Sequence, residues 1–176
     1  MDQILEKHGI EVCPLIETHL RSGDILRLAN YVCHRNYRLT EGGVIAILIS
    51  RGIYYHAVPV KVLVPGATAI QVFLAKQKPF KILAVYLSPS RSLTASDMSA
   101  CCGGTLPVLM AGDQNGKNVE WNSGLITNRS RLLRYYGSNT HITVPFKLSA
   151  KPDVLDVAIT KEIASPVYLF TFSALS

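Results

Sequence analysis

The chain has 176 residues, of which 48% are hydrophobic and 17% are charged, with 12 glycines and 9 prolines. This balance predicts one globular domain over 1–176 and excludes collagen, coiled coils and disordered chains. A net charge of +6 favours encounter with a polyanion, although a merely soluble basic surface would carry the same value.

Short apolar runs bounded by glycine, proline or polar residues predict strands in the first half of the chain. In chain order these runs are 12–16, 29–33, 44–49, 54–64, 67–75 and 81–87, preceded by a helix-like segment at 4–9. The first run ends abruptly at Glu17, as a buried strand does where its end opens into a site. Pro65-Gly66 is a turn dipeptide, so the two strands around it form a predicted hairpin.

The second half of the chain mixes strands with helices. Segment 94–100 permits one short helix, and 128–136 has the apolar spacing of a second helix that ends at Gly137. Further strands are predicted over 106–111, 141–145, 154–160 and 167–172. Many strands with two or three helices predict an α+β fold, a layered β-sandwich flanked by helices.

Acidic and amide side chains lie at or near the ends of several apolar runs. The acids are Glu17, Asp113 and Asp156, Asn115 follows Asp113 closely, and Tyr86 lies near the end of another run. A hard cation such as magnesium prefers oxygen ligands and takes few protein carboxylates beside water and substrate phosphate. Each acid alone is read more simply as a solvated turn residue, but as a set they predict a site where strands converge.

Five motifs follow one another along nearly the whole chain. They are Ile16-Glu17-Thr18-His19-Leu20, Gly42-Gly43-Val44-Ile45, Val85-Tyr86-Leu87-Ser88-Pro89, Gly112-Asp113-Gln114-Asn115-Gly116 with Trp121, and Pro152-Asp153-Val154-Leu155-Asp156. In this order they resemble the endonuclease/exonuclease/phosphatase superfamily. The likeness is closest to the endonuclease domain of jockey-like non-LTR retrotransposons, whose helix after the Gly-Asp-x-Asn loop resembles 128–133.

The resemblance implies a role for each candidate residue. Glu17 would ligate Mg2+, and Asp113 would orient or deprotonate the attacking water. Asn115 would hold the scissile phosphate through its amide, and Tyr86 would offer it a hydroxyl. Asp156 would orient a catalytic histidine. Taken without the resemblance, Glu17 is a surface acid and Tyr86 a core residue.

Basic residues predict contacts with the phosphate backbone of DNA. Several lie between the loop at Asp113 and the acid at Asp156, where one solvated face of a helix is an equally good interpretation. Two others belong to a segment that resembles an arginine-rich loop of the family that approaches DNA. The candidates are Arg35, Arg38, Lys117, Arg129, Arg131 and Arg134.

The sequence departs from the family pattern at both ends. A Ser-Asp-His motif follows the family strand that 167–172 resembles, but none of the five histidines here lies in that context. The family also opens with a strand and an asparagine loop that are not found before Glu17. We therefore expect a domain fragment incomplete at both termini, with weak cleavage or none, because losing a general acid or base costs about 10²–10⁴-fold in rate.

The cysteines and the amino terminus bear on the compartment. The four cysteines lack zinc spacing and predict reduced thiols, and the first residues carry acids where a secretory signal would carry basic residues. No apolar run reaches the ~20 residues of a membrane span. These features predict a nuclear or cytoplasmic protein that is not secreted and does not enter a membrane.

Three functions remain open from the sequence. The first is a magnesium-dependent DNA-nicking domain, whose parent polyprotein would carry a reverse transcriptase. The second is a nucleic-acid-binding remnant without catalysis, whose DNA affinity would survive Asp113→Ala and fall steeply with salt. The third is a phosphatase of the same superfamily, which 128–133 and 152–156 disfavour because they look like retroelement segments.

Overall fold

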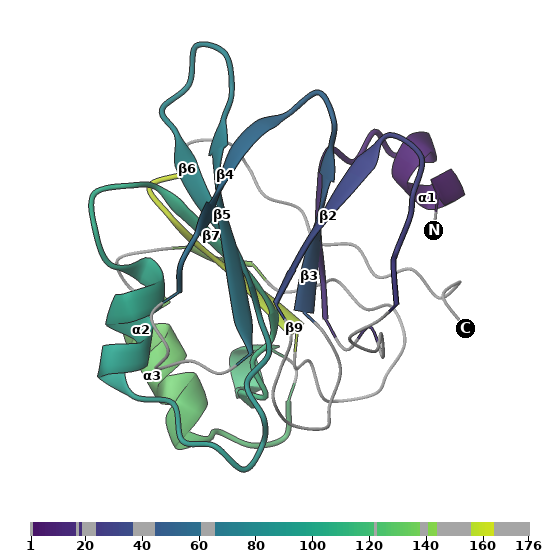
Figure 1. Ribbon diagram of the computed structural model, residues 1–176. Helices are drawn as coiled ribbons and strands as arrows, with labels where there is room; N and C mark the ends of the chain where they lie inside the picture. The colour runs from purple at the N-terminus through teal and green to yellow at the C-terminus, as the bar shows by residue number, and fades with distance from the viewer. Residues whose placement is uncertain are drawn as a thin grey trace.

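The computed structural model describes residues 2–16, 18, 24–36, 45–60, 66–121, 123–137, 141–143 and 156–163. In this part of the chain two β-sheets pack face to face, and two helices cover the outer face of the larger sheet (Figure 1). No helix in these ranges is long and apolar enough to cross a membrane. The predicted α+β sandwich with flanking helices is confirmed.

The smaller sheet has three antiparallel strands in the order β1-β3-β2. They are β1 (Val12–Leu15), β2 (Tyr31–Asn36) and β3 (Ile45–Ser50), and the helix α1 (Asp2–Lys7) precedes them. Every residue from Ile45 to Ile49 in the central strand is buried. This burial explains why the sequence of β3 is continuously apolar instead of alternating.

The larger sheet has six strands in the order β4-β5-β6-β7-β9-β8. Their bounds are β4 (Tyr54–Val58), β5 (Ala67–Phe73), β6 (Phe80–Val85), β7 (Val108–Asp113), β8 (His141–Thr143) and β9 (Asp156–Lys161). The β6 and β7 strands pair in parallel, and the other neighbours are antiparallel. A parallel pair needs a crossover connection, and α2 (Ala95–Cys102) lies in it.

The helices α2 and α3 (Asn128–Gly137) lie side by side on the outer face of the larger sheet (Figure 1). A capping box starts α2, because the Asp97 backbone N–H donates to the Thr94 hydroxyl and the Thr94 N–H donates to the Asp97 carboxylate. Before α3, the hydroxyl of Thr127 accepts from the backbone N–H of Ser130. Along the chain, the short 3-10 helix η1 (Val119–Trp121) lies between β7 and α3.

Strand alternation sorts the apolar side chains into two layers. The layer between the sheets contains Ile45, Ile47, Ile49, Ile70, Val72, Ile82 and Ala84. The layer under the helices contains Ala67, Ala69, Leu83, Val85, Met98, Met110, Trp121, Leu133, Val157 and Ile159. Each face of the larger sheet is therefore covered by a different partner.

The element boundaries differ from the predicted ones where backbone geometry intervenes. The second strand begins at Tyr31 instead of residue 29, because Asn30 has a positive φ of 62° and lies in a turn. The fourth strand ends at Val58 and does not reach residue 64, and Pro59, which follows it, has no N–H for a ladder. The helix α2 continues to Cys102. The strand predicted at 167–172 lies outside the described residues.

The parallel strands β6 and β7 come unusually close at Gly112. This glycine has a φ of 143°, and a Cβ placed on it would lie 2.0 Å from the carbonyl oxygen of Val85. Such contact is far inside van der Waals distance, so a side chain at this position would push the strands apart. Glycine is thus required at the point where β7 passes into the loop that follows it.

We expect Gly112→Ala to lower the free energy of unfolding by about 3 kcal/mol or more, because it combines backbone strain with a steric clash. Urea denaturation followed by circular dichroism measures the change. Gly52→Ala is the matched control, since a Cβ there meets nothing within 4 Å; it should shift stability by less than about 1 kcal/mol. Similar losses in the two variants would contradict this account.

Candidate functional site

The ends of three strands meet at one edge of the larger sheet. Because β6 and β7 run in parallel, Tyr86 just past β6 and Asp113 at the end of β7 lie at the same edge. In the antiparallel register of β7 with β9, Asp156 is paired with Asp113. Tyr86 packs on the layer between the sheets, and alternation places Asp113 on that same face. Three of the predicted positions therefore come together.

A tight turn shapes the loop that follows β7. The backbone N–H of Asn115 donates to Asp113 Oδ1 at 2.8 Å, and Asn115 itself has a φ of 47°. Asparagine tolerates this left-handed conformation better than most residues, and an aspartate two positions earlier closes the turn. The Asp113 carboxylate is thereby oriented by its own loop.

Two hydrogen bonds join this turn to the segment after β6. The N–H of Leu87 donates to the Asp113 carbonyl at 2.9 Å, and Asn115 Nδ2 donates to the Leu87 carbonyl at 3.0 Å. One of the two amide hydrogens of Asn115 is thus engaged with the backbone. The interaction also places the Asn115 side chain beside the residue that follows Tyr86.

Helix α3 packs directly against the loop at Gly116. A Cβ there would lie 2.9 Å from Leu133 Cδ1 and 3.4 Å from the ring of Trp121, so the glycine permits close packing. Lys117 and Thr127 then bond each other, the Lys117 N–H to the Thr127 hydroxyl and the Thr127 N–H to the Lys117 carbonyl. The start of α3 is therefore fixed relative to the candidate site.

Arg129 in the first turn of α3 connects both loops of the site. Its Nη1 donates to the carbonyls of Gln114 and Asn115, each at 3.2 Å. Its Nη2 donates to the carbonyl of Ser88 at 3.0 Å and to that of Arg91. Burial lowers the pKa of the Arg129 guanidinium, and the nearby negative charge of Asp113 opposes that shift. The positive charge of the Arg129 guanidinium thus offsets the negative charge of Asp113, and its hydrogen bonds join the two loops.

This placement differs from the sequence expectation for Arg129, which grouped it with the DNA contacts. Both Nη groups are turned to backbone carbonyls, so the guanidinium acts first on the shape of the site. No sequence signal marks such a role, because carbonyl partners carry no residue preference. The one sequence feature that points to this role is the position of Arg129 in the first turn of a helix that follows the Gly-Asp-x-Asn loop.

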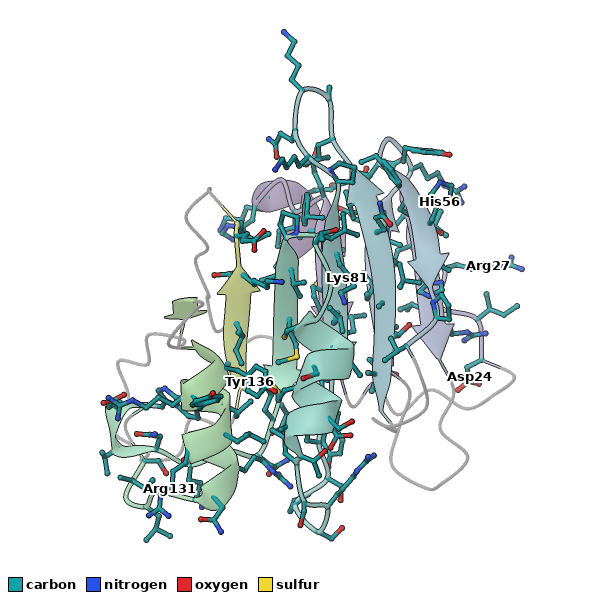
Figure 2. All side chains as sticks on the ribbon, turned by 90° about the vertical axis from the view of Figure 1, so that its left-hand side faces the viewer. Asp24, Arg27, His56, Lys81, Arg131 and Tyr136 are labelled. Carbon is teal, nitrogen blue, oxygen red and sulfur yellow. The ribbon has the colours of Figure 1, made fainter. Side chains whose placement is uncertain are left out.

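Two other predicted basic contacts lie on the exposed side of α3. Arg131 Nη1 donates to Asn128 Oδ1 at 3.1 Å, and Arg134 forms an exposed ion pair with Glu120 at 2.8 Å. Figure 2 shows Arg131 at the outer surface of the helix. Exposed pairs of this kind cost little to break, so both arginines can reach a ligand.

The remaining predicted basic residues are spread more widely. Lys117 lies in the site loop, half-buried. Arg35 belongs to β2 of the smaller sheet, where it donates to the Asp24 carbonyl. Arg38 lies outside the described residues. The structure thus groups Lys117 with α3 and places Arg35 on a different sheet.

The proposed metal ligand Glu17 also lies outside the described residues. Ile16 just before it packs on the same apolar layer as Tyr86, and β1 lies against β6 and β7. The described ranges contain no group of three His, Cys, Asp or Glu residues that could hold a metal. What they offer a hard cation is the carboxylate of Asp113 and the amide oxygen of Asn115, donors of the type that Mg2+ prefers.

Gln114, between Asp113 and Asn115, is a buried polar residue. Its side chain is fully buried, and Nε2 donates to the Val157 carbonyl at 3.4 Å. Its Oε1 has no hydrogen-bond partner in the part of the chain that the structure describes. A buried acceptor without a partner destabilises the fold, so a polar residue at this position carries a cost.

The adjacent thiols of Cys101 and Cys102 do not contribute chemistry. Both are buried residues in the last turn of α2, and burial raises the pKa of Cys102 and brings that of Cys101 to about 12. A thiol that stays protonated is a poor nucleophile and a poor metal ligand. This agrees with the predicted reduced cysteines without zinc spacing.

No family profile and no curated protein matches the sequence. Among solved structures, the chain is similar to the endonuclease domain of TRAS1, a telomere-specific non-LTR retrotransposon, with a TM-score of 0.72 and 13% identity. The similarity covers 90% of this chain and 76% of that chain. At such low identity the likeness shows the fold: the two-sheet α+β sandwich is the one that this endonuclease domain has.

Replacing Arg129 by alanine should lower the free energy of unfolding by roughly 2–4 kcal/mol, because charged hydrogen bonds to several carbonyls are lost together. Arg131→Ala, an exposed change on the same helix, should cost less than about 0.5 kcal/mol. Thermal and urea unfolding of both variants measures the difference. If the two substitutions cost the same, Arg129 does not tie the loops together.

Replacing Gln114 by leucine should raise the free energy of unfolding by about 1 kcal/mol. The leucine removes a buried acceptor without a partner and keeps a similar volume. Gln114→Glu serves as the opposite control, because a buried carboxylate should destabilise the fold strongly. Loss of stability in the leucine variant would mean that the amide makes a needed contact.

Proposed function

We propose that this chain is a DNA endonuclease domain of the retrotransposon type, a metal-dependent phosphodiester hydrolase. The observation that carries the proposal is the meeting of Tyr86, Asp113 and Asn115 at one sheet edge, with Asp156 opposite Asp113 in the register. An acid, an amide and a phenol gathered beside one another suit water activation and phosphate binding. The shared sandwich fold supports the same class of function.

In the proposed reaction each side chain has a distinct task. Asp113, whose Oδ1 is oriented by the Asn115 N–H, would orient the attacking water or accept its proton. The second amide hydrogen of Asn115 and the hydroxyl of Tyr86 would donate to the phosphate oxygens. Arg129 would keep the two loops in place through its bonds to their carbonyls.

Magnesium would be held by Glu17 together with oxygen donors from the loop at Asp113. When bound, such an ion supplies positive charge for the developing phosphate oxygens. The carboxylate of Asp113 and the amide of Asn115 offer oxygen donors, which fit a hard cation better than zinc.

We further propose that cleavage by these 176 residues is slow. The resemblance pairs Asp156 with a histidine, and none of the five histidines of this sequence has the corresponding context. The loss of one proton-transfer group lowers the reaction rate about 10²–10⁴-fold. A second candidate function, nucleic-acid binding without cleavage, gains support from the exposed Arg131 and Arg134 on α3.

Nicking of a supercoiled plasmid tests the proposal. With Mg2+ the chain should nick slowly, and Asp113→Asn should reduce the rate by about 10²-fold or more. Glu11→Gln is the control, because Glu11 is an exposed acid at the opposite end of β1 from residue 16. Both variants should keep the melting temperature of the parent chain to within a few degrees.

The same preparations distinguish the second function. If the parent chain shows no nicking at any metal concentration, or if Asp113→Asn nicks equally well, the hydrolase proposal is wrong. Duplex DNA affinity that falls steeply with salt and is unchanged in Asp113→Asn would then support binding alone.

A further inference from the structure

The larger sheet extends beyond the helices that cover it. On the helix-side face, α2 and α3 pack over the part that contains Ala69, Leu83 and Met110. One row further along the strands, His56, Gln71 and Lys81 lie opposite one another across β4, β5 and β6. Figure 2 shows Lys81 beyond the end of α2 and His56 on the outer strand, with the helices below them.

Three rings form a cluster on this uncovered part of the face. Tyr54 is paired with Phe73 in the next row, with ring centroids 5.3 Å apart. His56 lies edge-on to both, at 4.9 Å from Tyr54 and 5.1 Å from Phe73. The Tyr54 hydroxyl and His56 Nε2 are also 3.1 Å apart, within hydrogen-bond distance. The rings are therefore held in fixed orientations.

The cluster is open to solvent. Tyr54 is 62% exposed, His56 is exposed and Phe73 is half-buried. A tyrosine placed for packing alone would be covered, whereas Tyr54 contacts the rings of His56 and Phe73 and remains largely exposed. The cluster thus presents a rigid aromatic surface at the outer strand of the sheet.

The stretch of chain that carries the rings is basic. Residues 42–96 contain six lysines and arginines and no aspartate or glutamate. In the described part of this stretch, Arg51 precedes β4, Lys76 and Lys78 lie in the β5–β6 turn, and Lys81 begins the row described above. Lysines beside exposed rings are complementary to a polyanion that carries flat aromatic groups.

We propose that this surface, Tyr54, His56 and Phe73 with Lys76, Lys78 and Lys81, binds single-stranded nucleic acid. Unpaired bases stack on aromatic side chains of an open sheet face, and lysines beside them neutralise the backbone. In a duplex the faces of the bases are stacked on one another, so a duplex would make only charge contacts with the lysines. An acidic protein would use the lysines but would have no need of a fixed ring cluster.

The surface is separate from the candidate site. Tyr86 bonds to Gly66 at one end of β5, and Phe73 is the other end of that strand. Seven residues of strand span roughly 20 Å. The proposal therefore goes beyond cleavage at Asp113 and holds whether or not the chain nicks DNA.

Fluorescence anisotropy with a labelled oligo(dT) 20-mer tests the proposal. Tyr54→Leu should weaken binding about tenfold, whereas Tyr54→Phe should keep it, because the ring and not the hydroxyl stacks. Tyr135→Leu on α3 is the matched control, since Tyr135 is 72% exposed and lies away from the cluster; it should change affinity less than twofold. Lys76→Gln with Lys78→Gln should reduce the salt dependence of binding.

Two further ligands separate stacking from charge. An abasic 20-mer and a duplex of the same length should bind the Tyr54→Leu variant and the parent chain equally. The proposal is overturned if the parent chain does not bind oligo(dT), if Tyr54→Leu binds it as tightly as the parent, or if the loss is equal on the abasic strand. Tyr54→Phe and the lysine variants leave the core intact, so they test the proposal even if Tyr54→Leu misfolds. Weaker oligo(dT) binding by Tyr54→Phe, or an unchanged salt dependence in the lysine variant, would also overturn the proposal.

Discussion

The parallel pairing of β6 with β7 is the constraint on which the rest of this structure depends. It brings Leu87 beside Asp113 although 26 positions separate them, and the Asn115 amide then bonds back to Leu87. The close approach at Gly112 leaves no space for a side chain, and Arg129 closes the same junction from outside. Tyr86, Asp113 and Asn115 are all positioned through this one pair of strands.

The apolar layers explain why that junction can carry polar groups. The sheet is covered by helices on one face and by the smaller sheet on the other, so its strands are held without help from the loops. Loops on a rigid scaffold can then adopt unusual backbone conformations, such as that of Asn115. The unpartnered oxygen of Gln114 shows that some cost is tolerated beside the site.

Part of this structure could be predicted from the sequence and part could not. Runs such as 44–49 and 106–111 indicate strands by composition alone, and Asp113 after the second run indicates where strands converge. For Arg129 the sequence predicts only a DNA contact. Its carbonyl partners lie up to 41 positions away and can belong to any residue type, so the sequence does not reveal them. The ring cluster depends on the register of Tyr54 with Phe73, and composition does not determine register.

The crossover between β6 and β7 also bears on how the domain forms. A parallel pair gains its hydrogen bonds only after the intervening chain has closed into a loop, whereas a hairpin such as β5–β6 forms from neighbouring residues. We expect the hairpin to assemble early and the junction at Leu87 and Asp113 to close late, near the rate-limiting step. The candidate site would then form only after its scaffold is complete, because Asp113 and Asn115 are oriented by contacts across this junction.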